Sequence, residues 1–310
     1  MRVSGFTFVR DAVRLGYPVV PAIRSLLPLV DEMVVNVGVS ADGTLELVRA
    51  IGDPRLVVFE SRWDEALLER GRVLGQQTDL ALARCRGDLC LYVQADEAYH
   101  EDDHPAVRAA LARLADDRRI DGLLFDYVHF YGSFHTVGVG RRWYRREVRA
   151  VRNRAGVRSW KDAQGFRLLE GAAGGGPGGG GDGTAGRYRK LRVAPSGGRI
   201  FHYGWARPPA RQGERLAEFE RLYQGEGARA RRRARGFHYD PGEKVRPFNG
   251  THPAAMRAWV AEGDWPFAPR RRRLRLSNLR EDLLDLFEEA TGVRIGEYRN
   301  YELVRRPGRA

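Results

Sequence analysis

The stretch LCLYVQADE, residues 89–97, carries the strongest signal for the fold. Its first five residues are apolar on both faces of an extended chain, which is typical of a strand covered by helices on both sides. Beyond the carboxyl end of such a strand lies the ligand crevice of an open α/β sheet. Asp96 and Glu97 follow at that point. Two acidic side chains there can bind a divalent cation that neutralises a diphosphate, or they can cap the next helix.

Apolar runs of the same kind alternate with helical patterns through the first half of the chain. The predicted strands are Val3 to Val9, Met33 to Val37, Arg55 to Glu60, Leu89 to Gln94 and Gly122 to Val128. The predicted helices are about Val19 to Leu27, a segment from Gly43, about Arg72 to Arg84, and a segment that begins at Pro105, where the missing N–H costs nothing. This alternation predicts an α/β fold, with a mostly parallel sheet flanked by helices.

The second half of the chain changes in composition. Residues 171–186 are nearly all Gly and Ala and predict a flexible surface insertion. The segment RKLRVAPSGGRIFHYGW, residues 189–205, predicts a return to the core. Beyond it the chain is basic and mainly helical, and Ser277 is expected to cap a helix to about Thr291, with Leu279, Leu283, Leu286 and Phe287 on one face. We therefore expect a domain over residues 1–205 and a helical C-terminal extension over residues 206–310.

The charge and cysteine content limit the classes of function. The net charge is +13, and lysine occurs only at Lys161, Lys190 and Lys244, so the positive charge is almost all arginine. Basic residues occur along most of the chain, and this indicates a compositional bias more than a polyanion site. The runs 229–235 and 270–275 are the exceptions, and they could contact phosphates or an anionic membrane surface. Two cysteines suggest neither a disulfide framework nor a zinc site, so we expect a reducing, cytoplasmic location.

A second turn precedes a predicted helix. Ser40-Ala41-Asp42-Gly43-Thr44 follows the strand at Met33 to Val37, and the free N–H groups of a helix N-terminus favour anions. Taken alone, this is a generic turn. In order and spacing, however, SGFTFVRD, VDEMVVNVGVSADGT and CRGDLCLYVQADE resemble glycosyltransferase family two, which has the GT-A fold. The resemblance covers about the first 205 residues, and DYVHFYGS, RRWYRRE, DAQGF and FHYGW are similar to a subgroup with QADE in place of the usual DxD motif.

The resemblance implies a nucleotide-sugar donor, a saccharide or other hydroxyl acceptor, and Mn²⁺ or Mg²⁺. The implied donor-binding residues are Thr7, Arg10, Ser40, Asp42, Asp79, Gln94, Ala95 and Asp96. The implied metal ligands are Asp96, Glu97 and His202, and a neutral imidazole suits Mn²⁺ better than Mg²⁺. Gln94 replaces the first aspartate of the motif, so metal binding would rest mainly on Asp96.

Inverting transfer needs a general base that deprotonates the acceptor hydroxyl. Asp162 is the first candidate, with Asp126 and Glu147 as alternatives. The expected acceptor residues are Trp160, His129 and Tyr131, although the aromatic residues can also simply pack.

Two other functions compete with an inverting, metal-dependent glycosyltransferase. One is a basic nucleic-acid-binding protein, but the sequence contains no recognised module of that kind, so we do not expect nucleic acid as a partner. The other is a GT-A-like protein that binds nucleotide without catalysis. The sequence gives no indication of the sugar, the acceptor or the oligomeric state.

Overall fold

A computed structural model describes residues 1–64, 67, 69–170, 186–263, 265–269 and 279–304. Its strands are β1 (Val3–Val9), β2 (Glu32–Gly38), β3 (Leu56–Ser61), β4 (Leu89–Tyr92), β5 (Glu97–Tyr99), β6 (Gly122–Tyr131), β7 (Thr136–Gly138), β8 (Arg146–Arg152), β9 (Val157–Trp160), β10 (Gly165–Leu169), β11 (Tyr188–Trp205), β12 (Val245–Pro247) and β13 (Tyr301–Leu303). Its α-helices are α1 (Ala12–Leu15), α2 (Val19–Leu26), α3 (Thr44–Arg49), α4 (Arg72–Leu82), α5 (His104–Asp116), α6 (Pro209–Gln224), α7 (Glu226–Arg235), α8 (Arg257–Ala261) and α9 (Leu279–Thr291). Short 3-10 turns are η1 (Leu27–Leu29), η3 (Glu69–Gly71), η4 (Glu101–Asp103) and η5 (Ala254–Met256).

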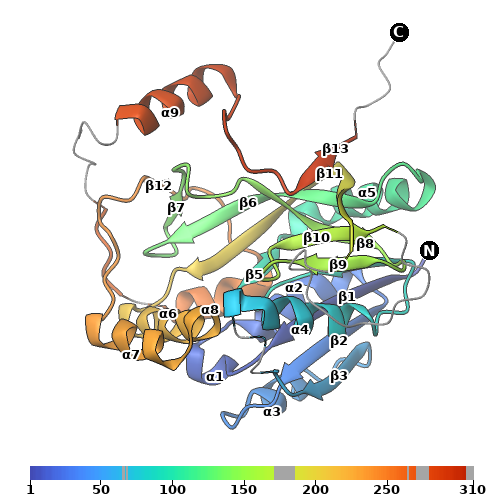
Figure 1. Ribbon diagram of the computed structural model, residues 1–310, viewed down its shortest axis with the longest axis horizontal. Coiled ribbons are helices and arrows are strands. Elements are labelled where there is room, and N and C mark those ends of the chain that lie inside the picture. Colours follow the sequence, from blue (N-terminus) through green and yellow to red (C-terminus); the bar gives the residue numbers. More distant parts are fainter. Residues whose placement is uncertain (65–66, 68, 171–185, 264, 270–278, 305–310) are drawn as a thin grey trace.

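The predicted α/β fold is confirmed. The main sheet has the order β3-β2-β1-β4-β8-β6-β11-β10-β9 (Figure 1). Strands β3, β2, β1 and β4 are parallel neighbours, as alternating strands and helices require. The sheet becomes mixed beyond β4, because β8 lies antiparallel between β4 and β6.

Both faces of the parallel part are buried. Along β4, Leu89 and Leu91 pack with α2 and α5 on one face, whereas Cys90 and Tyr92 pack with α4 and β9–β10 on the other. Successive side chains of a strand point to opposite faces, so a strand buried on both sides must be apolar at every position. This is the physical reason that the uninterrupted apolar run at residues 89–93 marks the centre of the sheet.

The sequence pattern predicts no strand between residues 130 and 170, where the structure has β7 to β10. Strand β8 reads REVRAVR, and its alternation of charged and apolar residues looks like a surface segment. The structure nevertheless buries its middle, including Arg149, because β8 fills the position between two central strands. Tertiary pairing therefore overrides the local pattern at this point.

The C-terminal part returns to the body at several places. Helix α6 packs against α7, η3 and α1, and β13 pairs with β11 (Figure 1). On α9, Leu283 and Phe287 are exposed, so the apolar face that the sequence predicted is not packed against the body. The Gly-rich insertion at residues 171–185, the arginines at 270–275 and the expected cap Ser277 lie outside the described residues.

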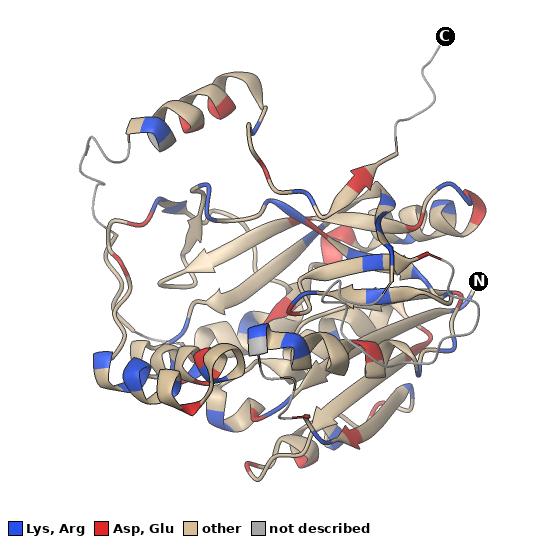
Figure 2. Cartoon of the chain, in the orientation of Figure 1, with Lys and Arg blue, Asp and Glu red and all other residues tan. Residues whose placement is uncertain are grey.

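Lys and Arg residues are distributed over sheet and helices, and Asp and Glu residues lie among them (Figure 2). In the run at residues 229–235, Arg232 pairs with Glu220 and Arg233 pairs with Glu214, both on α6. Part of this run therefore neutralises the neighbouring helix.

Candidate functional site

The main cavity lies at the carboxyl ends of β1 and β4 and has a volume of about 400 Å³. It is bordered by the segment after β1, by the turn after β4, by the loop between β9 and β10, by the end of β11, and by α6. Its polar lining residues are Arg10, Asp11, Gln94, Asp96, Asp162, Gln164, His202, Arg215 and Glu218. A cavity at this edge of an open α/β sheet is the default place for ligand binding.

Gln94 connects two walls of the cavity. Its side-chain amide Nε2 donates a hydrogen bond to the backbone oxygen of Ala163 at 3.0 Å. A carbonyl oxygen only accepts, so an ionised aspartate at position 94 could not make this contact. The glutamine at this position therefore has a structural role, since its amide joins the turn after β4 to the loop that contains Asp162.

Glu97, which the sequence assigned to the metal ligands, points into the sheet and not into the cavity. Both oxygens are occupied: Arg149 donates from Nη2 to Oε1 at 2.9 Å and from Nε to Oε2 at 3.0 Å. The hydroxyl of Tyr127 also donates to Oε1 at 2.7 Å, and the backbone N–H of Gln94 donates to Oε2 at 3.0 Å. Glu97 accepts from four donors, and through the N–H of Gln94 it stabilises the turn after β4. Asp96 and His202 remain as the expected ligands that reach the cavity.

The side chains of Asp96 and His202 both lie close to Gly204. A Cβ atom added to Gly204 would lie 2.5 Å from His202 Nε2 and 2.9 Å from Asp96 Oδ2. Burial raises the pKa of Asp96, but the nearby His202, Arg207 and Arg215 outweigh this effect, and the net shift of that pKa is downward. Within the described ranges, no group of three or more His, Cys, Asp or Glu side chains could hold a metal ion. A cation at Gly204 would therefore have two side-chain ligands and would need others from a bound substrate or water.

His129 fixes the tautomer of His202. Its Nε2 lies 2.7 Å from the backbone oxygen of Tyr144, and its Nδ1 lies 2.9 Å from His202 Nδ1. The carbonyl only accepts, so His129 Nε2 carries the proton and, in the neutral ring, Nδ1 is an acceptor. His202 must then donate from Nδ1, and this leaves the lone pair of its Nε2 directed toward Asp96 and Gly204. Burial lowers the pKa of both imidazoles, which keeps them neutral.

Asp162 lies at the cavity in an unusual backbone conformation. Its two neighbours, Lys161 and Ala163, have φ values of 57° and 65°, in the left-handed region that disfavours residues with a Cβ atom. Such conformations cost on the order of 1 kcal/mol each and persist where the surroundings enforce them. The hydroxyl of Tyr223 on α6 donates to Asp162 Oδ2. The loop is thus held from two sides, and its carboxylate faces the cavity.

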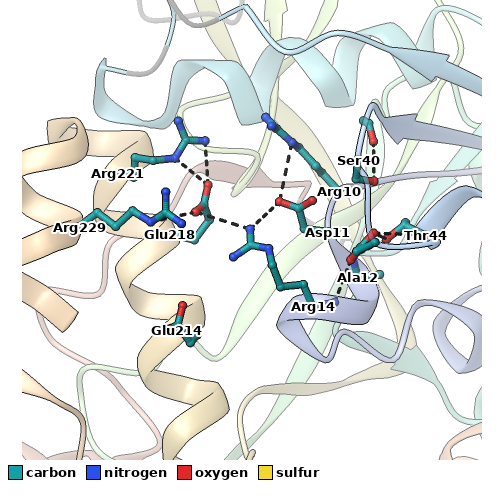
Figure 3. A network of polar contacts seen from close by, with 12 residues as sticks. Arg10, Asp11, Ala12, Arg14, Ser40, Thr44, Glu214, Glu218, Arg221 and Arg229 are labelled. Atoms are coloured by element: carbon teal, nitrogen blue, oxygen red, sulfur yellow. Dashed lines mark hydrogen bonds and ion pairs between the residues drawn. The ribbon is translucent and has the colours of Figure 1, made fainter.

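An ion network connects α1 with α6 (Figure 3), and Asp11 and Glu218 of this network line the cavity. Arg14 Nη2 lies 2.6 Å from Asp11 Oδ2 and 3.6 Å from Glu218 Oε2. On the other side of Glu218 stand Arg221 and Arg229. Sequence reasoning missed this wall, and also missed Arg207 and Arg215. The only available signal was the basic segment that follows FHYGW.

Several expected donor-binding residues lie outside the cavity lining. Asp42 accepts hydrogen bonds from the N–H of Thr44 at 3.1 Å and of Arg14 at 2.8 Å, so it shapes the turn before α3. The hydroxyl of Ser40 donates to the backbone oxygen of Gly38. Thr7 is buried within β1. Asp79, on α4, accepts from the N–H of Ser159 and borders a separate small pocket. Of the expected donor residues, Arg10, Gln94, Ala95 and Asp96 line the main cavity.

The remaining candidates are also separated by the tertiary structure. Asp126 is exposed on β6 beside Arg146, and Glu147 is buried on β8, where burial raises its pKa to about 7. Trp160 packs against Arg167 and Tyr188, and Tyr131 packs in a cluster with Trp143 and Tyr239. Of the three candidate bases, Asp162 lines the cavity.

Comparisons with known proteins give a weak likeness. No family model and no curated protein matches the chain. Among solved structures, S. aureus TarS is similar at 15% identity with a TM-score of 0.34, covering 49% of this chain and 28% of that one. Mannosyl-3-phosphoglycerate synthase from Rubrobacter xylanophilus is similar at 22% identity with a TM-score of 0.30, covering 46% and 43%. Glucosyl-3-phosphoglycerate synthase from Mycobacterium tuberculosis, in complex with Mn²⁺, UDP and phosphoglyceric acid, is similar at 21% identity with a TM-score of 0.27, covering 42% and 43%. The match spans less than half the length of each of these proteins, and at these scores it does not enter the functional argument.

Among the described helices, none is both long enough and apolar enough to cross a lipid bilayer.

Proposed function

We propose that the protein is a glycosyltransferase that uses a nucleotide-diphosphate sugar. One observation supports this most strongly: Asp96, His202 and Asp162, from three segments far apart in the sequence, line one cavity at the carboxyl edge of a parallel sheet. The first two suit a cation and a diphosphate, and the third suits the removal of a proton. An inverting, metal-dependent sugar transfer uses both functions.

Asp96 and His202 are the residues that would hold a divalent cation, beside Gly204. The free lone pair of His202 Nε2 and the carboxylate oxygen of Asp96 both approach this glycine, which has no side chain between them and the cavity. Imidazole and carboxylate together are a donor set that Mn²⁺ accepts. A cation held there supplies positive charge to a diphosphate leaving group.

Asp162 is proposed as the general base. In the inverting reaction the acceptor hydroxyl oxygen bonds to the anomeric carbon, and the bond from that carbon to the diphosphate oxygen breaks. The hydroxyl proton passes to the Asp162 carboxylate, and the leaving group departs as a nucleoside diphosphate. The hydrogen bond from Tyr223 and the contact between Gln94 and Ala163 orient this carboxylate.

We assign the catalytic domain to residues 1–205, with 206–310 as an extension that completes the site. Helix α6 supports this assignment, because Arg215 and Glu218 on that helix line the cavity beside Asp96.

Thermal-shift titrations test the proposal. UDP, GDP, dTDP and CDP would each be added with Mn²⁺, Mg²⁺ or EDTA. A ligand that binds only the folded state at ~100 times its dissociation constant adds ~2.7 kcal/mol of stability. We expect one nucleoside diphosphate to stabilise the protein with metal, and Asp96→Asn to remove that metal-dependent effect. The matched control is Asp126→Asn, which removes an exposed carboxylate outside the cavity.

A different pair of results would contradict the proposal. If no nucleoside diphosphate raises the melting temperature, and nucleic acid binds tightly with a steep salt dependence, the transferase proposal fails and the basic charge becomes the main functional feature.

A further inference from the structure

Arg207 is a buried guanidinium without hydrogen bonds. It follows β11, its exposed fraction is 1%, and its Nε, Nη1 and Nη2 atoms have no hydrogen-bond partner within the described residues. Asp96 Oδ2 lies 3.6 Å from Nη2, and the ring of Tyr17 lies 4.5 Å from the guanidinium carbon. A buried charge normally has paired and hydrogen-bonded atoms, because otherwise its desolvation costs several kcal/mol. Apart from its ion pair with Asp96, the hydrogen-bond donors of the Arg207 guanidinium are therefore unused.

Arg215 is a second guanidinium near Asp96, and it lines the cavity. This residue of α6 is 9% exposed, and its Nε also has no hydrogen-bond partner in the described part of the chain. Its guanidinium carbon stands 5.7 Å from the ring centre of Trp205.

Other arginines of the same wall differ from this pair. Arg14, Arg221 and Arg229 each form an ion pair with Glu218. Of the other carboxylates that line the cavity, Asp11 and Glu218 are paired with Arg14, and Asp162 accepts a hydrogen bond from Tyr223. Asp96 forms the ion pair with Arg207 and also faces His202 and Arg215. An anion in the cavity would balance the charge of Arg215.

We propose that Arg215, supported by Arg207, binds the phosphoryl groups of an anionic ligand beside Asp96. A guanidinium fork matches phosphate oxygens with two parallel hydrogen bonds, and such charge-assisted bonds are among the strong ones in proteins. This inference rests on the proposed function for the identity of the ligand, which is the diphosphate of the sugar donor.

The position of the pair favours the diphosphate. Arg207 contacts the same Asp96 oxygen that borders Gly204, so a phosphate bound there lies within the reach of the wall that contains Arg215. When the bond to the sugar breaks, the leaving group gains one negative charge. Fixed positive charge at that place stabilises the product side of the reaction more than the donor itself. An acceptor with its own phosphate group is the second source of the same chemistry.

The test is calorimetric titration in EDTA, so that no metal contributes. The probes are inorganic pyrophosphate, glycerol 3-phosphate, and the four nucleoside diphosphates UDP, GDP, dTDP and CDP. The variants are Arg215→Gln and Arg215→Lys, with Arg211→Gln as the matched control, because Arg211 is exposed on the same helix and its replacement changes the net charge equally. Circular dichroism verifies that each variant is folded.

We expect Arg215→Gln to weaken binding of pyrophosphate and of one nucleoside diphosphate about 10- to 100-fold, as the loss of one or two charged hydrogen bonds predicts. Arg215→Lys should lose less, and Arg211→Gln should leave binding unchanged. If glycerol 3-phosphate alone shows this dependence, the phosphoryl site belongs to the acceptor. If a nucleoside diphosphate binds equally to wild type and Arg215→Gln, or if the wild type binds none of the phosphate probes, the inference is overturned.

The two proposals can fail separately. Pyrophosphate binding that depends on Arg215, without binding of any nucleoside diphosphate, would uphold the phosphoryl site and contradict the transferase. Metal-dependent binding of a nucleoside diphosphate that is unchanged in Arg215→Gln would uphold the transferase and contradict the phosphoryl site.

Discussion

Replacing Glu97 by glutamine should destabilise the protein strongly. Glu97 and Arg149 form an ion pair with 0% exposure on both side chains and an N–O distance of 2.9 Å. Removing one partner of such a pair leaves a buried charge unbalanced, and this costs about 3–5 kcal/mol. Glutamine has the same shape but replaces one oxygen by an NH₂ group. Because each oxygen of Glu97 accepts from two donors, that group would face two donors in either orientation.

Urea denaturation followed by circular dichroism measures the effect. The expected loss corresponds to a fall in melting temperature of about 6–15 °C, at roughly 2–3 °C per kcal/mol for a chain of this size. The matched control is Glu170→Gln. Glu170 pairs with Arg187 at the same 2.9 Å, but the two side chains are 38% and 88% exposed. An exposed pair of this kind contributes about 0–1 kcal/mol.

A double-mutant cycle separates the pair from the simple loss of contacts. In Arg149→Met combined with Glu97→Gln, no unbalanced charge remains, so the combined loss should be smaller than the sum of the single losses by 0.5 kcal/mol or more. The reasoning is refuted if Glu97→Gln unfolds at the same urea concentration as Glu170→Gln, or if the single losses simply add.

Three further predictions concern the site and its surroundings. The free energy of unfolding should fall as the pH rises from about 4.5 to about 7. Burial raises the pKa of Glu147 from 4.5 to about 7, so in this range the native state keeps a proton that the unfolded chain releases. This group contributes about 2–3 kcal/mol to the decline, and Glu147→Gln should show a shallower decline in urea midpoints between pH 5 and pH 8. His129→Phe should weaken Mn²⁺ binding about 10- to 100-fold in calorimetric titration, because His202 loses the partner that fixes its tautomer; unchanged affinity would contradict the tautomer assignment. Gly204→Ala places a methyl group between His202 Nε2 and Asp96 Oδ2 and should abolish the Mn²⁺ dependence of nucleoside diphosphate binding in thermal-shift titration, whereas retained dependence would place the cation elsewhere.

The elements of the first half could be predicted because their signals are local. Strand β4 and helix α4 are marked by their own periodicity and composition, and the turn at residues 94–97 follows the strand directly in the sequence. The edge of the sheet where ligands bind follows from the parallel order of the strands. The sequence therefore predicts that Gln94 and Asp96 lie at this edge, and both line the cavity.

The roles within the site could not be predicted in this way. Glu97 and Asp96 are adjacent in sequence and alike in chemistry, and only the buried position of Arg149 on β8 decides that Glu97 turns inward. Likewise, the sequence ranks Asp162 before Glu147 as a candidate base, but only the tertiary structure shows that Asp162 lies at the cavity and Glu147 within the sheet.

The sequence by itself determined the order of strands and helices in the parallel half, and the place where its motifs come together. The tertiary structure alone decided the antiparallel insertion of β8, the tautomer of His202, and the presence of Arg207 and Arg215 beside Asp96. The physical reason is the range of the interactions. Periodicity and turn chemistry act over a few residues, whereas the charge and hydrogen-bond partners of a buried side chain come from segments tens of residues away, as Glu97 and Arg149 do.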